Sequence, residues 1–332
     1  MGWSILPRQG EDRVAKPSLL APPRRRGDEA GRMTDRTTRN GLLLGVGAYA
    51  AWGLLPLYLK LLGHVPAAQV LSHRILWSLL LLGAIVLILR QGREIAAAAR
   101  GRTLLMLCAS AALIAVNWYV YIWAIEHAHV LEASLGYFIN PLVNVALGVA
   151  VLGERVSRAQ KVAVGIAAAG VVVMAASGGG AIWISLVLAL SFGTYGLIRK
   201  TVAVGALGGL TIETLILAPF ALAMLLYAAE AGTGAWGRDG RTDLLLVLAG
   251  GVTAAPLLMF AGGARRLRYT TMGLLQYIAP TLQFLEAVLL FGERLRPVHV
   301  ATFALIWSGC VLYAMDSWRA ARRGRVGDGE GA

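Results

Sequence analysis

Long apolar runs separated by short polar connections dominate the sequence. A helix that crosses the hydrocarbon core of a membrane needs about 20 mostly apolar residues. Ten runs reach this length, and they cover residues 41–59, 67–89, 103–124, 132–152, 160–177, 181–198, 207–228, 243–263, 270–291 and 297–315. The pattern therefore predicts an all-α integral membrane protein with ten transmembrane helices and no domain outside the membrane.

The composition supports a membrane protein and argues against other classes. Of the 332 residues, 57% are apolar and 15% are charged, whereas a soluble domain carries about 25% charged residues. The net charge of +13 is scattered along the chain and forms no single basic stripe, which argues against a nucleic-acid partner. Cys108 and Cys310 lie far apart in apolar runs and form no zinc-binding motif. We expect no metal and no cofactor.

The distribution of basic residues predicts the orientation. The cytoplasmic side of a membrane protein retains most of the Lys and Arg residues. With the N-terminus in the cytoplasm, 25 of the 31 basic residues lie on that side, five lie on the other, and Arg74 lies within a helix. We therefore expect both termini to be cytoplasmic. Residues 1–40 are polar and predict a disordered tail, with Met33 as an alternative start, and residues 317–332 form a second tail.

The chain contains an internal repeat. At a spacing of 139 residues, YFINPLVNVALGVAVLGER, which ends at Arg155, aligns with QYIAPTLQFLEAVLLFGER, which ends at Arg294. Both copies end in Gly-Glu-Arg, which we interpret as a helix end and an interface anchor. Each repeat holds five helices, and an odd number makes the second repeat cross the membrane in the opposite sense. The sequence thus predicts two inverted five-helix repeats, 41–178 and 179–316, an architecture common among secondary transporters.

Eight segments carry a resemblance to a known family. They are AAWGLLPLYLK (50–60), LSHRILWS (71–78), NWYVYIWA (117–124), LEASLGYFINPLVN (131–144), LSFGTYGLIRK (190–200), ETLILAP (213–219), GVTAAPLLMF (251–260) and GLLQYIAPTLQFL (273–285). Together they resemble the drug/metabolite transporter superfamily, and within it the EamA-domain family and its RarD subgroup, which is linked by name to chloramphenicol sensitivity. The resemblance covers about residues 33–318. It implies a multi-pass carrier of small organic solutes or metabolites in the bacterial inner membrane, commonly an exporter.

Charged residues inside the predicted spans are candidates for the transport pathway. Polar groups are costly in a bilayer and usually face the interior of the bundle. His73 and Arg74, about 10 Å inside the second span by the helical rise, are candidates for substrate binding. Glu213, which the repeat matches to Arg74, is a candidate for coupling or gating. The two charges could meet near the midplane or form two gates, and Arg74 could instead extend to the lipid headgroups or cap a neighbouring helix.

Aromatic and amide side chains recur at helical spacing and would suit a neutral or zwitterionic organic solute. In the fourth span they lie three and four residues apart and so share one helical face. The candidates are Tyr137, Asn140 and Asn144 there, Asn117, Trp118 and Tyr121 in the third span, and Gln276, Tyr277 and Gln283 in the ninth. The alternative is that these groups hydrogen-bond between helices, which contributes about 0.6 kcal/mol per bond in membrane bundles.

Two prolines occupy matching positions in the repeats. Pro141 and Pro280 each remove one helical hydrogen bond, which would leave the carbonyls of Tyr137 and Gln276 without a helical partner. We interpret the prolines as hinge candidates, and kinks that serve packing alone are an equal alternative. Glu286, deep in the ninth span, is a second candidate for coupling.

The sequence lacks the motifs of other classes of membrane protein. There is no GxxxxGK[ST] loop for ATP and no HExxH or GxSxG motif for hydrolysis. We therefore predict a secondary transporter, and not an enzyme, that exports a solute by opening a midplane cavity between the repeats to each side in turn. The alternative is a membrane enzyme or an accessory protein that alters antibiotic susceptibility indirectly. The expected partners are a small organic solute, the lipid bilayer and a second copy of the chain.

Overall fold

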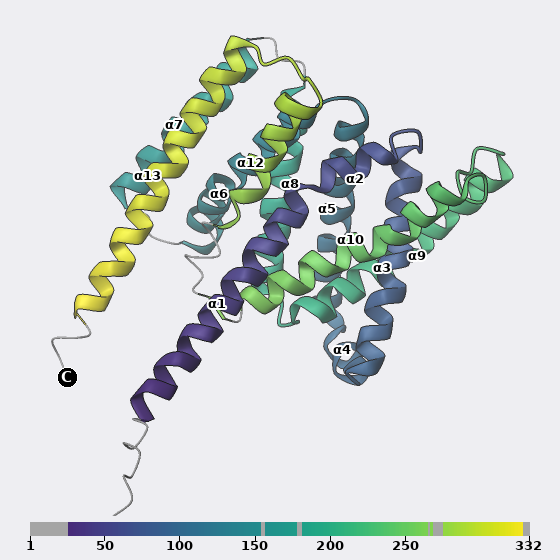
Figure 1. Ribbon diagram of the computed structural model, residues 1–332, viewed down its shortest axis with the longest axis horizontal. Coiled ribbons are helices and arrows are strands. Elements are labelled where there is room, and N and C mark those ends of the chain that lie inside the picture. Colours follow the sequence, from purple (N-terminus) through teal and green to yellow (C-terminus); the bar gives the residue numbers. More distant parts are fainter. Residues whose placement is uncertain (1–25, 154–156, 178–180, 265, 268–274, 328–332) are drawn as a thin grey trace, which may run out of the picture.

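The computed structural model describes residues 26–153, 157–177, 181–264, 266–267 and 275–327. Every regular element in these ranges is a helix (Figure 1). The α-helices are α1 (Arg26–Gly53), α2 (Leu55–Leu61), α3 (Ala67–Ile88), α4 (Gly92–Ala98), α5 (Gly101–Glu126), α6 (Val130–Leu152), α7 (Arg158–Ala176), α8 (Ile182–Thr201), α9 (Ala206–Glu230), α10 (Gly240–Ala264), α12 (Ile278–Leu285) and α13 (Pro297–Gly327). A π-helix, η1 (Glu286–Leu290), directly follows α12.

The helices agree with the predicted membrane spans. Within the described ranges, nine helices are long and apolar enough to cross a membrane, and they correspond to nine of the ten predicted spans. The remaining span, predicted over 270–291, is represented by a shorter apolar helix over Ile278–Leu290, and its first residues lie outside the described ranges. The prediction of an all-helical, multi-pass membrane protein is confirmed.

Three helix boundaries differ from the prediction. α1 already begins at Arg26 and α13 continues to Gly327, so helix extends into both segments that the sequence predicts as tails. Arginine, which is frequent in both segments, is a good helix former, so a helix need not end where the apolar run ends. In the ninth span, Gln276 and Tyr277 form a turn, and α12 begins only at Ile278.

The helix boundaries repeat with the spacing found in the sequence. α3, α5 and α7 begin at Ala67, Gly101 and Arg158, and α9, α10 and α13 each begin 139 residues later. Gly153 and Gly292, also 139 residues apart, both have a left-handed backbone, with φ of 65° and 64°. Residues with a side chain rarely adopt this conformation. The two halves of the chain therefore share the same order of helices and turns.

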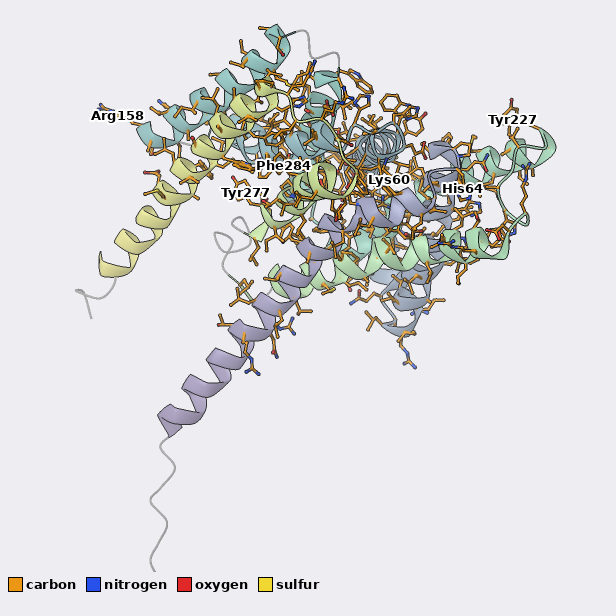
Figure 2. All side chains as sticks on the ribbon, turned by 45° about the horizontal axis from the view of Figure 1, so that its top comes forward. Lys60, His64, Arg158, Tyr227, Tyr277 and Phe284 are labelled. Carbon is orange, nitrogen blue, oxygen red and sulfur yellow. The ribbon has the colours of Figure 1, made fainter. Side chains whose placement is uncertain are left out.

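The helices pack with a pseudo-twofold relation. α3 packs against its counterpart α9, and α7 packs against its counterpart α13. Other contacts come in matched pairs: α1 with α10 matches α8 with α5, and α1 with α12 matches α8 with α6. In Figure 1 the α7–α13 pair forms one edge of the bundle, and in Figure 2 Arg158 of α7 and Tyr227 of α9 lie at opposite edges. Because α1 packs mainly against helices of the second half, the two halves interlock.

α10 approaches α3 closely at Gly250. A Cβ atom added there would lie 2.6 Å from the carbonyl carbon of Trp77 on α3. At the next position, Gly251, an added Cβ would meet no described atom within 4 Å. The contact between the two helices therefore depends on the absence of a side chain at Gly250. It holds Thr253, about one turn later, against α3.

Candidate functional site

Arg74 on α3 points into the bundle, where its side chain is 6% exposed. Its Nε donates a hydrogen bond to Oγ1 of Thr253 on α10 at 2.6 Å. Its guanidinium carbon lies 4.7 Å from the centroid of the Trp118 ring on α5. Its Nη1 has no hydrogen-bond partner among the described residues. The structure thus contradicts the alternative in which Arg74 extends to the lipid headgroups. The sequence does not single out Thr253, because a lone threonine in an apolar run carries little signal.

Two of the tyrosines near Arg74 also lie beside each other. The ring centroids of Tyr121 on α5 and Tyr137 on α6 are 5.6 Å apart, and both hydroxyls lie within electrostatic range of the guanidinium. The Tyr121 hydroxyl and Oδ1 of Asn140, which lies about one turn after Tyr137, are buried without a hydrogen-bond partner in the described part of the chain. Buried polar groups almost always have partners. These atoms are therefore candidates for contact with a solute.

Asn117 connects three helices. Its Nδ2 donates to the carbonyl oxygen of Leu188 at 3.1 Å and to Oγ of Ser191 at 3.0 Å, both on α8. Its Oδ1 accepts a hydrogen bond of 3.2 Å from the Tyr137 hydroxyl. This is the interhelical bonding that the sequence leaves open as an alternative. Asn117 therefore positions Tyr137 and has both ends of its amide occupied.

The second repeat places one carboxyl group, that of Glu286, near these residues. It is the first residue of η1 and is 4% exposed, and neither of its carboxylate oxygens has a hydrogen-bond partner among the residues described. It lies within electrostatic range of Tyr121. π-helices are rare and occur frequently at functional sites. We call the following residues the Arg74 cluster: Arg74, Trp118, Tyr121, Tyr137 and Glu286.

Glu213 on α9 belongs to a second polar cluster. Its Oε1 accepts a hydrogen bond of 2.6 Å from Ser110 on α5, and its Oε2 accepts one of 3.2 Å from Tyr195 on α8. Nη1 of Arg199 lies 3.8 Å from Oε1. Among the described residues, Glu213 and Arg74 form no ion pair with each other. Of the two arrangements left open by the sequence, the structure therefore has two separate charged clusters.

His73 points in a different direction from Arg74, because successive side chains on a helix are about 100° apart. Its ring stacks on Trp236, with centroids 5.4 Å apart. It faces a groove of about 580 Å³ between α3, α9 and the segment after α9. The groove is also lined by Gln69, Trp77 and Arg238. The structure thus separates His73 from the Arg74 cluster.

The other predicted binding residues also lie outside the Arg74 cluster. Asn144 is exposed on α6, while Gln276 and Tyr277 are half-buried in the turn before α12. The Tyr277 ring stacks on Phe138, with centroids 6.3 Å apart. Gln283 is buried on α12, and its Nε2 donates a hydrogen bond of 3.1 Å to the backbone of α1.

The two prolines have different surroundings. Pro141 lies in the interior of α6, as the sequence predicts. Pro280 is the third residue of α12, in the first turn, where a missing N–H breaks no helical hydrogen bond. Its carbonyl accepts a hydrogen bond of 2.8 Å from Ser134 on α6. The prediction of a kink within a long helix therefore does not describe Pro280, because the helix starts beside it.

Glu293 caps a helix of the other repeat. Its two carboxylate oxygens accept hydrogen bonds from the backbone N–H groups of Val130 and Leu131, at 2.8 and 2.9 Å, at the start of α6. Burial raises the pKa of Glu293 to about 6. A carboxylate at a helix N-terminus also complements the helix dipole. This contact is an interface anchor of the kind predicted for the Gly-Glu-Arg triplet, and its counterpart Glu154 lies outside the described residues.

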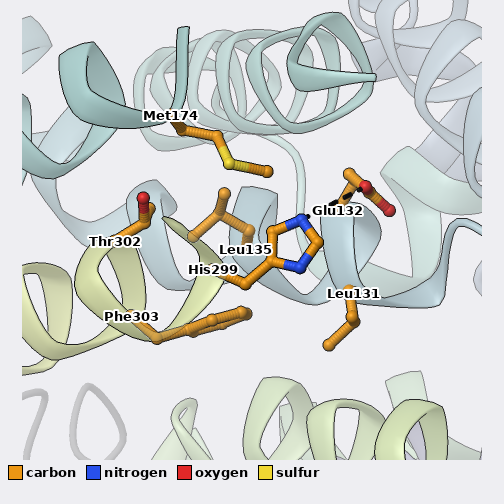
Figure 3. Close-up of a pocket in the computed structure, with 7 residues that line it drawn as sticks. All are labelled: Leu131, Glu132, Leu135, Met174, His299, Thr302 and Phe303. Atoms are coloured by element: carbon orange, nitrogen blue, oxygen red, sulfur yellow. Dashed lines mark ion pairs between the residues drawn. The ribbon is translucent and has the colours of Figure 1, made fainter. Parts of the chain in front are cut away.

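A histidine and a glutamate, which the sequence does not single out, lie in a narrow pocket between α6, α7 and α13 (Figure 3). Nε2 of His299 is 3.9 Å from Oε1 of Glu132. Leu135, Met174 and Phe303 form part of the walls. The pocket leaves no room for a water-sized molecule. It is therefore a packed seam between helices.

Comparisons with known proteins identify the family. The model of the EamA-like transporter family matches residues 39–176. An uncharacterized transporter of Pseudomonas aeruginosa is 45% identical over 88% of this chain and 98% of that protein. Protein RarD of Streptomyces exfoliatus is 47% identical over 87% of this chain and 92% of its own. This chain belongs to the EamA-like transporter family, in its RarD subgroup.

A more distant relative agrees with this family, and a solved structure agrees with the fold. The chloramphenicol-sensitive protein RarD of Pseudomonas aeruginosa is 35% identical over 87% of this chain and 98% of its own. One crystal structure has a TM-score of 0.56 and 19% identity, and the match covers 83% of this chain and 97% of that chain. At this identity the likeness shows the fold alone.

In this EamA-family chain, the Arg74 cluster draws on both repeats. α3, α5 and α6 supply the guanidinium and the aromatic rings, and η1 supplies the carboxylate. Thr253 on α10 holds Arg74 in place. The cluster therefore combines one buried guanidinium group, one buried carboxyl group and three aromatic rings at the contact between the two halves.

Proposed function

We propose that the chain is a secondary transporter that exports a small organic solute across the bacterial inner membrane, with both termini in the cytoplasm. The observation that carries this proposal is the Arg74 cluster, where Arg74, Tyr121 and Glu286 have buried polar atoms without partners among the described residues. Ionisable groups within a membrane usually line a substrate or ion pathway. Relatives named as transporters support a role in transport.

The positions of the two charged clusters support alternating access. Arg74 lies seven residues after the start of α3, and Glu213 lies seven residues after the start of α9. Each is thus about 10 Å along its helix. In an inverted repeat these depths are measured from opposite faces of the membrane, so the clusters lie on either side of the midplane. A rocking motion that opens one cluster and closes the other would expose a solute to each side in turn.

Metabolite profiling of a deletion strain tests the proposal. The strain is complemented with the wild type, with Arg74→Ala or with Glu230→Gln, a change of an exposed carboxylate at the end of α9. We expect one solute to accumulate inside the deletion strain and the Arg74→Ala strain, and to appear in the medium with the wild type and Glu230→Gln. Immunoblots of the membranes confirm equal protein levels. A product that is missing from both cells and medium, with no retained solute, would indicate an enzyme and refute transport.

A further inference from the structure

The Arg74 cluster contains two ionisable groups of opposite sign that are not paired with each other. Arg74 comes from the first repeat and Glu286 from the second, and both are buried. The two are not within ion-pair distance of each other in the part of the chain that the structure describes. Both nevertheless lie within electrostatic range of Tyr121. Tyr121 thus lies near a buried guanidinium group and a buried carboxyl group.

The protein leaves both ionisable groups without a full set of hydrogen bonds. Nη1 of Arg74, both carboxylate oxygens of Glu286 and the Tyr121 hydroxyl have no hydrogen-bond partner within the described ranges. A buried charge is costly unless it is paired and hydrogen-bonded. A ligand with one charge can relieve only one of these groups. A ligand with an anionic and a cationic end can relieve both.

The second cluster provides an internal comparison. Glu213 is as deeply buried as Glu286, and its carboxylate has Ser110, Tyr195 and Arg199 within reach. The fold can therefore surround a buried carboxylate with partners, as it does for Glu213. Glu286 differs because its partners are missing and because it begins a π-helix. Both features favour a binding role.

The chemistry of the two charged groups suggests what each end would bind. The planar guanidinium of Arg74 has spare donors after its hydrogen bond to Thr253 and suits a carboxylate. The free carboxylate of Glu286 suits an ammonium group. The rings of Trp118 and Tyr121 offer an aromatic surface for an apolar or aromatic framework between the two charges.

We infer that the solute is a dipolar organic molecule whose anionic group binds Arg74 and whose cationic nitrogen binds Glu286. The inference rests on the proposed function, because it names the class of solute that the Arg74 cluster takes. Glu286 is then a specificity residue, since it favours solutes that carry an amine over anions of the same shape.

Three probes with one aromatic framework test the charge assignment. They are 4-(aminomethyl)benzoate, which carries both charges, 4-methylbenzoate, which carries only the anion, and 4-methylbenzylamine, which carries only the cation. Binding to the purified full chain in detergent is measured by isothermal calorimetry. We expect the wild type to bind the dipolar probe at least about tenfold more tightly than either singly charged probe, as hydrogen bonds to charged groups allow.

Two variants should change the preference in opposite ways. Glu286→Gln should bind 4-(aminomethyl)benzoate no better than 4-methylbenzoate, and Arg74→Gln should bind it no better than 4-methylbenzylamine. Glu230→Gln, which changes an exposed carboxylate, should keep the preference of the wild type. A wild type that does not prefer the dipolar probe overturns the inference. A Glu286→Gln variant that weakens all three probes equally also overturns it, because that result indicates a structural role.

Uptake into proteoliposomes separates this inference from the proposed function. If the dipolar probe binds as expected but is not moved by the wild type, the proposed transport fails and the charge assignment stands. If a solute without the two charges is moved and Glu286→Gln moves it equally well, transport stands and the charge assignment fails.

Discussion

An alanine at Gly250 should separate α10 from α3 and so disturb the Arg74 cluster from a distance. The added Cβ would lie 2.6 Å from the carbonyl carbon of Trp77 and 2.7 Å from its oxygen. Ordinary contact begins at 3.4 Å, so relief of the closest contact requires a local shift of about 0.8 Å. The atoms in the way belong to backbone, which cannot move aside like the end of a flexible side chain. The hydrogen bond of 2.6 Å between Arg74 and Thr253 would then lengthen beyond the usual range.

The magnitude follows from two opposing terms. Overpacking costs about 1–3 kcal/mol, and alanine is favoured over glycine in a helix by about 0.5–1 kcal/mol. The two terms leave a net loss of about 0–2.5 kcal/mol. Because the closest atoms are backbone, we expect Gly250→Ala to lower the free energy of unfolding by an amount in the upper part of this range, about 1–2.5 kcal/mol. Gly251→Ala is the matched control on the same helix. Its added methyl group meets no described atom within 4 Å, so this variant should be as stable as the wild type or slightly more stable.

Thermal unfolding of the purified proteins in one detergent, followed by the circular dichroism of the helices, measures the difference. Binding of 4-(aminomethyl)benzoate at a temperature where all three proteins are folded reports on the Arg74 cluster. Gly250→Ala should melt at a lower temperature and bind more weakly, while Gly251→Ala should do neither. Equal melting temperatures for the two variants would refute the close approach of α10 to α3.

Three further changes test individual contacts. Arg74→Lys keeps the charge but loses the planar guanidinium that lies over the Trp118 ring and bonds to Thr253. Export in the complemented deletion strain should therefore fall at least about tenfold. Export at the wild-type rate would contradict a role of the guanidinium in solute binding. Asn117→Ala removes the partner of the Tyr137 hydroxyl and the connection to α8, so the free energy of unfolding should fall by about 1–3 kcal/mol. An unchanged melting temperature would contradict a stabilising role of these hydrogen bonds. Burial raises the pKa of Glu293 from 4.5 to about 6, so the folded chain binds this proton more tightly than the unfolded chain. The free energy of unfolding should therefore fall as the pH rises from 4.5 to about 6. In Glu293→Gln, the free energy of unfolding should depend less on pH over this range. Identical slopes for the variant and the wild type would show that Glu293 does not cause the pH dependence.

The sequence predicts the helices well because each span must be apolar along nearly its whole length. That requirement leaves a strong signal, and the described spans lie close to the predicted runs. It also marks Arg74, since a charge in an apolar run is costly unless it has a role. The sequence does not indicate that His73 faces a different part of the protein, because that depends on which helices pack on either side of α3.

Contacts across the repeats are the part of the site that the sequence does not predict. Thr253 lies far from Arg74 along the chain, and a threonine is common enough in apolar helices to pass unnoticed. The cap that Glu293 places on α6 depends on the meeting of two helix ends. Glu286 is unpaired because the neighbouring described residues place no hydrogen-bond donor within reach of its carboxylate oxygens. Each of these features follows from the three-dimensional arrangement of helices and leaves no local pattern of residues.

The interlocked halves have a consequence for the order in which the protein is assembled. α1 ends at Gly53, whereas its main packing partners, α10 and α12, begin at Gly240 and Ile278. Chains enter the membrane from the N-terminus as they are synthesised. α1 must therefore wait in the lipid, or with the insertion machinery, until the ribosome has made most of the second half. A chain whose synthesis stops after the first repeat would keep this surface of α1 uncovered, which gives quality-control proteases a means of recognising an unfinished protein.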